Sequence, residues 1–191
     1  MKKIISFVII TSLFLACNST SNSDESHSHD TDSAKAEAAS IDITHQEHKG
    51  STEKGSFDRL LTDYITLKNA LVEDNSKTAS EAGKTIVASL EKISKSSSKA
   101  ELEILESIKE NAEHIRDNTG KLDHQREHFA LISKDVIDLI TKSGTSKKLY
   151  QDFCPMYNDN KGTAWISETK EIKNPYYGSQ MLTCGSVKKE Y

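Results

Sequence analysis

Four successive segments of this chain repeat apolar side chains at helical spacing, and this pattern constrains the fold more than any other feature of the sequence. The four apolar stripes are Phe57, Leu60, Leu61, Tyr64, Leu67 and Leu71; Ala79, Ala82, Gly83, Ile86, Leu90 and Ile93; Leu102, Leu105, Ile108, Ala112 and Ile115; and Leu122, Phe129, Ile132, Val136, Leu139 and Ile140. Each stripe gives one face of an α-helix an apolar surface, which has to be buried against another element.

The connections between the stripes are short and polar. Ser98 and Glu101 stand three positions apart at the start of the third stripe, a spacing typical of a capping box. Helices of roughly twenty residues with short connections favour antiparallel neighbours. We therefore predict an all-α fold in which residues 56–145 form an up-down antiparallel four-helix bundle. The stripes would be its core, with no chemical role.

The pattern changes after the fourth stripe. Residues 146–191 lose the helical periodicity and contain aromatic residues and turn formers. Residues 159–162 and 174–178 are typical of turns, and residues 162–167 of a short strand. Because this segment is too short to bury a core of its own, we expect a small turn and short-strand extension packed on the bundle.

The chain begins with a sequence typical of bacterial lipoprotein export. Lys2 and Lys3 precede an apolar run over residues 4–16, which is shorter than the roughly 20 residues that span a bilayer. The run ends in Leu-Phe-Leu-Ala directly before Cys17, as in a lipobox. We predict a lipoprotein signal peptide over residues 1–16. Acylated Cys17 would anchor the mature chain to a lipid bilayer of the cell envelope, exposed outside the cytoplasm in the periplasm or at the outer membrane.

Residues 17–55 have no hydrophobic pattern and are rich in small polar and acidic residues. Such a composition cannot bury enough apolar surface to fold, which predicts a disordered, lipidated tether. Four of the seven histidines lie in it: His27, His29, His45 and His48. They are candidates for weak metal capture, since imidazoles beside carboxylates bind divalent ions loosely. The alternative is a solvated linker.

Charge and motif content exclude several classes of function. The formal net charge is −4, and loss of Lys2 and Lys3 with the signal peptide would take it to about −6 (−4 minus 2), which argues against a nucleic acid partner. The chain has no nucleophile elbow, no phosphate-binding glycine loop and no His-Glu-x-x-His motif. We therefore expect no enzymatic activity.

The sulfur-containing side chains gather near the C-terminus. Cys154 and Met156 stand two positions apart, so that both would point to one face of an extended segment, and Met181 and Cys184 stand three apart, as on one face of a helical turn. Turns between the two pairs could bring them together. Thiolate and thioether ligands select soft ions such as Cu(I). The cluster predicts a copper site.

The two cysteines have a second interpretation. In the oxidising envelope, Cys154 and Cys184 could pair as a structural disulfide that closes a loop of about 30 residues and contributes roughly 3–4 kcal/mol. Met156 and Met181 would then be gap-filling core residues. The residues alone leave both interpretations open.

Two histidines of the fourth helical segment are further candidates. His124 and His128 are four positions apart, so their rings share one helix face. Phe129 belongs to the buried stripe, which places His128 at its flank, from where it could reach a unit packed on the bundle. The alternatives are a boundary histidine with a satisfied hydrogen bond and a surface His124.

The same region carries a resemblance to a known family. The blocks that carry it are Gln125-Arg126-Glu127-His128-Phe129, Leu149-Tyr150, Cys154-Pro155-Met156, Trp165-Ile166-Ser167, Ile172-Lys173-Asn174-Pro175-Tyr176-Tyr177-Gly178 and Met181-Leu182-Thr183-Cys184-Gly185. They resemble an uncharacterised helical domain family, found as stand-alone lipoproteins of Bacteroidetes-type bacteria and at the C-terminus of periplasmic adaptor subunits of copper/silver efflux systems. The resemblance covers about residues 56 to 188.

What the resemblance implies is a helical domain associated with heavy-metal handling outside the inner membrane. Cys154, Met156, Met181, Cys184 and His128 match the family's pattern, whereas His124 is not carried over. The chain has no adaptor hairpin or barrel domain, so it is not itself the adaptor of a pump.

Two hypotheses about function follow. The first is an exported lipoprotein that binds Cu(I) or Ag(I) and buffers the ion or delivers it to components of a heavy-metal efflux pump. The second is a non-metal interaction domain of the envelope, stapled by a disulfide between Cys154 and Cys184.

Overall fold

The computed structural model describes residues 57–93 and 97–191. The predicted signal peptide, the lipidation site Cys17 and the tether histidines His27, His29, His45 and His48 lie outside the described residues.

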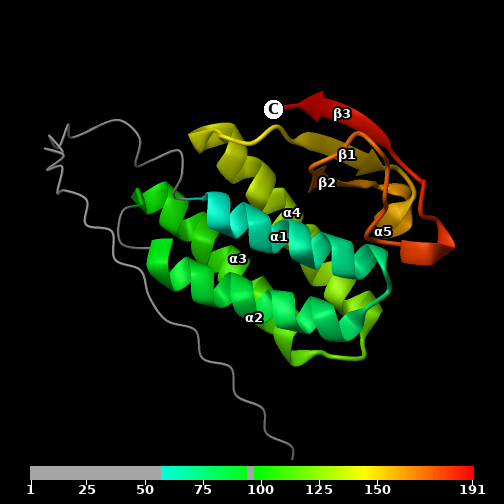
Figure 1. The fold of residues 1–191 in the computed structure, drawn as a ribbon, viewed down its shortest axis with the longest axis horizontal. Coiled ribbons are helices and arrows are strands. Elements are labelled where there is room, and N and C mark those ends of the chain that lie inside the picture. Colours follow the sequence, from blue (N-terminus) through cyan, green and yellow to red (C-terminus); the bar gives the residue numbers. More distant parts are fainter. Residues whose placement is uncertain (1–56, 94–96) are drawn as a thin grey trace, which may run out of the picture. The chain divides into compact units, whose positions relative to one another are not determined.

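Four long helices form most of the described chain (Figure 1). They are α1 (Asp58–Val72), α2 (Ser76–Ile93), α3 (Lys99–Asp117) and α4 (Leu122–Ser143), and each coincides with one of the four apolar stripes. The remaining elements are β1 (Tyr150–Cys154), α5 (Tyr157–Asn160), β2 (Thr163–Ser167), the 3₁₀ helix η1 (Gly178–Gln180) and β3 (Ser186–Glu190). The predicted four helices are therefore confirmed, but the fold is mostly helical rather than all-α.

The capping box at the start of α3 is confirmed. The backbone N–H of Glu101 donates to the Ser98 hydroxyl at 3.3 Å, and the backbone N–H of Ser98 donates to the Glu101 carboxylate at 2.8 Å. Two backbone donors at the helix N-terminus are thus satisfied by the side chains of the two residues.

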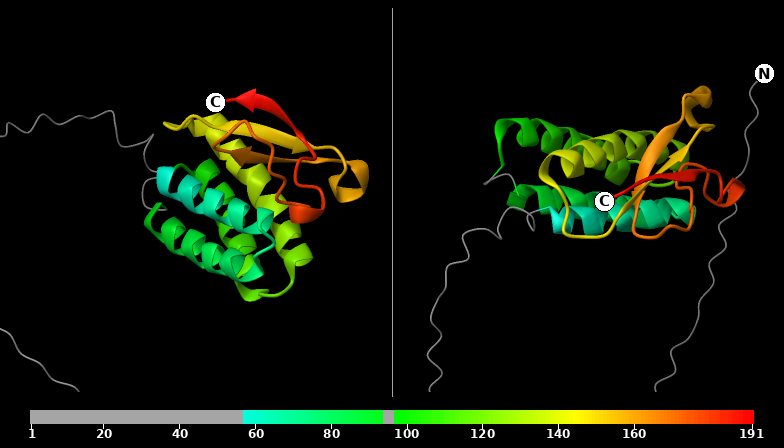
Figure 2. Two further views of the ribbon diagram at one scale, coloured as in Figure 1. Left: turned by 45° about the vertical axis from the view of Figure 1, so that its right-hand side comes forward. Right: turned by 90° about the horizontal axis from the view of Figure 1, so that it is seen from above.

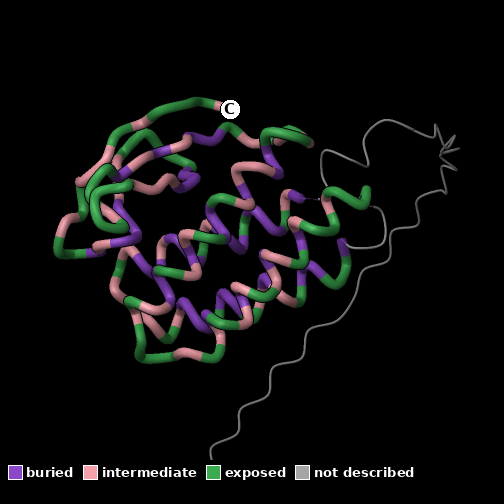
Figure 3. Tube along the Cα trace, turned by 180° about the vertical axis from the view of Figure 1, so that it is seen from behind, coloured by how far each residue is buried: buried purple, intermediate pink, exposed green. Residues whose placement is uncertain are grey.

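Each long helix packs against the next in the chain, α1 on α2, α2 on α3 and α3 on α4 (Figure 2). Their inward faces form one core, which also contains Trp165 and Tyr176 from the C-terminal segment. Figure 3 marks the buried positions along the chain. Most stripe residues are buried, whereas Leu102 is exposed. None of the helices in the described part of the chain is both long enough and apolar enough to span a membrane.

The three strands form an antiparallel sheet in the order β2-β1-β3. The predicted strand corresponds to β2, which packs on α4. The backbone N–H of Ile166 in β2 donates to the Tyr64 hydroxyl of α1 at 3.1 Å, and that hydroxyl pairs with Ser133 of α4 at 2.8 Å. A buried tyrosine thus fixes the sheet to two helices at once.

Gly83 marks a close approach of α2 to α3. A Cβ atom at this position would lie 2.8 Å from the carbonyl oxygen of Ala112 and 3.1 Å from the backbone nitrogen of Arg116. Both neighbours are backbone atoms of a helix, so a side chain here could be accommodated only by moving the helices apart.

We therefore expect Gly83→Ala to lower the free energy of unfolding by about 1–3 kcal/mol, the cost of overpacking, despite the better helix propensity of alanine. Urea unfolding followed by circular dichroism measures the change. Lys84→Ala alters the next, exposed residue of the same helix and should change stability by no more than about 0.5 kcal/mol. A Gly83→Ala protein as stable as the parent would contradict the close packing of α2 on α3.

Candidate metal sites

Three histidine rings meet where α3 and α4 lie side by side. His114 comes from α3, and His124 and His128 come from α4. The rings of His114 and His128 are stacked at 4.3 Å with their planes 3° apart, and the His124 ring meets His128 edge-on at 4.5 Å. One potential ligand atom from each lies within 4.8 Å of the others. Among residues 57–93 and 97–191, no other group of three or more His, Cys, Asp or Glu side chains comes together in this way.

Asn111 of α3 holds the His128 ring. Its side-chain oxygen lies 2.8 Å from His128 Nδ1, while its amide nitrogen donates to the Ser107 carbonyl at 2.8 Å. His124 Nδ1 lies 3.6 Å from the Glu127 carboxylate. Partial burial lowers the pKa of His128, and the neighbouring His114 and His124 lower it further. The neutral imidazole, which is the metal-binding form, is therefore favoured at His128.

The two cysteines also meet. Cys154 ends β1 and is buried, Cys184 lies just before β3, and their sulfur atoms are 3.1 Å apart as free cysteines. The hydrogen bond with Cys154 raises the pKa of Cys184 to about 11, together with burial and the charge of a Cys154 thiolate. The Cys184 thiol therefore stays protonated near neutral pH.

The Asn-Pro-Tyr-Tyr-Gly block positions Cys184. The Asn174 side chain donates to the Cys184 carbonyl at 2.7 Å, and its backbone N–H donates to the Leu182 carbonyl at 2.8 Å. The Tyr177 hydroxyl donates to the carbonyl of Met156 at 3.1 Å. This loop thus binds both to the segment of Cys184 and to the turn that follows Cys154.

The two methionines lie on turns close in sequence to the cysteines. Met156 precedes α5 with a side chain that is exposed, and Met181 follows η1 and is half-buried. The Cys184 backbone N–H donates to the Met181 carbonyl at 3.0 Å.

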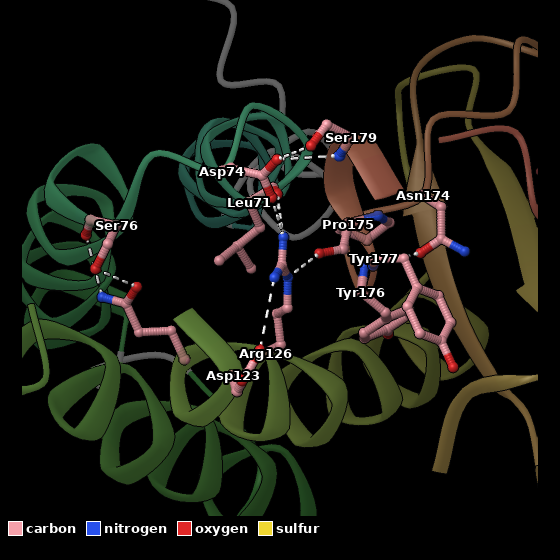
Figure 4. A network of polar contacts seen from close by, with 11 residues as sticks. Leu71, Asp74, Ser76, Asp123, Arg126, Asn174, Pro175, Tyr176, Tyr177 and Ser179 are labelled. Atoms are coloured by element: carbon pink, nitrogen blue, oxygen red, sulfur yellow. Dashed lines mark hydrogen bonds and ion pairs between the residues drawn. The ribbon is translucent and has the colours of Figure 1, made fainter. Parts of the chain in front are cut away.

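Of the six predicted metal ligands, Cys154 and Cys184 lie together, and His124 and His128 lie together in the histidine cluster. Arg126 stands two residues from both histidines, which is a rotation of about 200° around the helix. Its guanidinium donates to the Pro175 carbonyl at 3.0 Å, so that side of α4 faces the C-terminal segment (Figure 4). The histidines face α3 instead. His114 was not identified from the sequence, where it reads as an exposed residue of a helix.

Arg126 also joins the C-terminal loop to the α1–α2 turn (Figure 4). It donates to the Leu71 carbonyl at 3.2 Å and forms an ion pair with Asp74. Asp74 in turn accepts the backbone N–H of Ser179 at 3.1 Å. Hydrogen bonds from Ser179 and Arg126 lower the pKa of Asp74. The loop that leads to Cys184 is therefore anchored on the helices.

The family model described as "Protein of unknown function (DUF3347)" matches residues 60–148. The match covers nearly all of α1 and the whole of α2, α3 and α4, including the three clustered histidines, and it ends before β1 and the two cysteines. No curated protein and no solved structure shows a significant match to the chain. This region therefore resembles an uncharacterised domain family.

Asp152 is a buried carboxylate in the strand that carries Cys154. Among the described residues, neither of its carboxylate oxygens has a hydrogen-bond partner. Burial raises its pKa to about 6, and the nearby charge of Lys68 reduces the shift. Lys68 is itself buried and pairs with Glu168 at 3.5 Å.

Because its pKa is raised on folding, Asp152 should make the protein less stable as the pH rises from about 4 to about 6, since the folded protein keeps a proton that the unfolded chain has lost. A shift of this size corresponds to about 2–3 kcal/mol. We expect Asp152→Asn to remove this loss, so that its stability relative to the parent improves between about pH 4 and pH 7.

Urea unfolding of the parent and of Asp152→Asn, each at about pH 4 and about pH 7, measures this difference in stability. Glu103→Gln, at an exposed position of α3, serves as the matched control and should leave the pH dependence as in the parent. An equal pH dependence in Asp152→Asn and the parent would show that Asp152 ionises normally in the folded protein.

Proposed function

We propose that this protein is an exported lipoprotein that binds soft heavy-metal ions, Cu(I) or Ag(I), and buffers them or delivers them to efflux machinery. The observation that carries the proposal is the approach of the Cys154 and Cys184 sulfurs to 3.1 Å, with both thiols free. Two thiolates side by side are ligands that select soft ions over hard ones such as Mg²⁺ or Ca²⁺.

The two cysteines are held in place by different elements. Cys154 is held by strand β1, which pairs with β2 on one side and with β3 on the other. Cys184 is held by the hydrogen bond from Asn174. Because the pKa of Cys184 is raised, an incoming ion has to displace a proton, and binding releases it to solvent. The exposed Met156 and the half-buried Met181 are the thioether candidates for further coordination.

The helices would serve as the platform for this site. We take them as an up-down antiparallel bundle, which is supported by contacts between the ends of neighbouring helices. Ser143 near the end of α4 donates to Glu101 near the start of α3 at 2.7 Å, and Gln125 near the start of α4 donates to the Ile115 carbonyl near the end of α3 at 3.0 Å.

The cellular setting rests on the N-terminal sequence and on the family resemblance. The lipobox before Cys17 supports export and a lipid anchor in the envelope. The resemblance to domains fused to copper/silver efflux adaptors supports pump components as partners. The proposal includes no catalytic step and no nucleic acid.

The same approach of the sulfurs favours a second candidate, an envelope interaction domain stapled by a Cys154–Cys184 disulfide. A disulfide needs a sulfur separation of about 2.05 Å, so the two cysteines would have to move closer by roughly 1 Å. The two candidates differ in the state of Cys154 and Cys184 in protein isolated from the envelope. The disulfide candidate predicts that neither cysteine reacts with a thiol reagent.

The test of metal binding is Cu(I) competition with a chromophoric chelator, carried out on the full chain without oxygen. We expect tight binding of one ion, weakened by about 100-fold or more in Cys154→Ser/Cys184→Ser, because a hydroxyl is a poor ligand for a soft ion. Met156→Leu and Met181→Leu should each cause a smaller loss, because both thiolates remain.

Ser186→Ala, in the exposed start of β3 beside Cys184, is the matched control and should bind as the parent does. Circular dichroism of each variant establishes that it is folded, which matters for the buried Cys154. Full Cu(I) affinity in the folded double variant would overturn the dithiol site. Oxidised thiols together with no binding after reduction would favour the disulfide staple.

Lipidation has its own test. We expect the intact mass of protein from the envelope fraction to equal that of a chain starting at Cys17 with acyl chains attached. Cys17→Ser should abolish both the acyl mass and the association with membranes, and Ser19→Ala should leave both unchanged. Membrane-bound Cys17→Ser protein would rule out the lipid anchor.

A further inference from the structure

We propose that His114, His124 and His128 form a second metal site, which binds a borderline divalent cation such as Zn²⁺ or Cu²⁺ through three imidazoles. The three side chains come from two helices, and their candidate ligand atoms lie within 4.8 Å of one another. Imidazole is a ligand that suits Zn²⁺ and Cu²⁺, whereas the dithiol suits softer ions. The site is therefore distinct in chemistry from the one proposed above.

The rings have to move closer for one ion to bind all three. Zinc–nitrogen bonds are about 2.0–2.1 Å long, so the nitrogens around a tetrahedral ion are about 3.4 Å apart. The candidate ligand atoms lie within 4.8 Å of one another, so the widest separation has to close by up to roughly 1.4 Å. His114 is exposed and His124 is half-buried, so side-chain rotations can provide this movement and turn the stacked His114 ring toward the ion.

Asn111 prepares His128 for coordination. Because the Asn111 amide nitrogen donates to the Ser107 carbonyl, its oxygen faces His128 and accepts a hydrogen bond from Nδ1–H. The proton is thereby kept on Nδ1, which leaves Nε2 as the nitrogen with a lone pair for an ion. Metal-binding histidines typically donate their other N–H to an oxygen in this way. This contact favours coordination through Nε2.

Glu127 lies beside His124 on the same helix. Its carboxylate is 3.6 Å from His124 Nδ1, which is too long for a hydrogen bond. The orienting hydrogen bond in the cluster is therefore the one between Asn111 and His128.

The carboxylates beside His114 are paired with a neighbouring arginine. Arg116 pairs with Asp117 at 2.7 Å and with Glu113 at 3.8 Å, so these carboxylates beside His114 already have a partner. Three protein ligands with the fourth position open to solvent are typical of zinc sites that exchange water or a ligand. The geometry therefore fits an ion that is loaded and released.

The site can be tested with Zn²⁺, which does not oxidise thiols. Zn²⁺ is titrated into the full chain in competition with a chromophoric chelator. We expect His114→Ala, His124→Ala and His128→Ala each to lower the affinity for one bound equivalent of Zn²⁺. The loss should be at least about 10–100-fold, which is the loss typical when a residue that only orients a ligand is removed. Asn111→Ala should weaken the same equivalent by about 10–100-fold, because it removes only the orienting hydrogen bond.

Glu103→Gln, at an exposed position of α3 away from the three histidines, is the control for a substitution elsewhere on the same helix and should leave this equivalent unchanged. Cys154→Ser/Cys184→Ser should also keep it, which separates the histidine site from the dithiol whatever the outcome with Cu(I). Zn²⁺ affinity that is equal in the parent and in folded His114→Ala and His128→Ala proteins would overturn the proposal.

A second measurement needs no substitution. In the unmodified chain labelled with ¹⁵N at histidine, one equivalent of Zn²⁺ should shift the Nε2 signals of three histidines, with an Nδ1–H retained at His128. Shifts confined to the tether histidines would overturn the assignment, and so would the absence of any shift.

Discussion

The arrangement of the C-terminal segment depends on the contacts that the buried guanidinium of Arg126 makes. A buried charge is costly unless it is paired and hydrogen-bonded, and Arg126 satisfies its donors with the carbonyls of Leu71 and Pro175 and with Asp74. These partners come from the end of α1, the turn after it and the C-terminal loop. One side chain of α4 therefore determines where the loop leading to Cys184 lies, and the opposite side of α4 is left for contacts with α3.

The sequence predicted the helices well because their apolar residues repeat at helical spacing, but the sheet was only partly predictable. In β1 the buried middle residue is Asp152, which interrupts the alternation of apolar and polar residues that marks a strand. In β3 four of the five residues are exposed, and the segment Ser186–Glu190 has one apolar residue. A strand held mainly by backbone pairing at a sheet edge leaves little hydrophobic pattern to detect.

The sequence indicated the sulfur-containing side chains and two of the three clustered histidines as candidates, but neither their grouping nor the part of His114. The four-residue spacing that puts His124 and His128 on one helix face can be read directly from the sequence. Which element this face contacts depends on the burial of Arg126 on the opposite side of α4, and no local pattern indicated that burial. His114 depends on the register of α3 against α4, which the contacts of Asn111 with His128 and of Ser107 with Asp135 establish. A register between two helices follows from the turn and from packing, so it cannot be read from either helix alone.

The two proposed sites would respond differently to the conditions of the envelope. A dithiol binds a soft ion only while it is reduced, and an oxidising compartment favours its conversion to a disulfide. Imidazoles do not undergo this oxidation, so the histidine site would keep its ligands in both states of the cysteines. Residues 60–148 contain all three histidines and neither cysteine. The redox-independent site would thus belong to the helices that match the family model, and the redox-dependent site to the segment that Arg126 anchors on them.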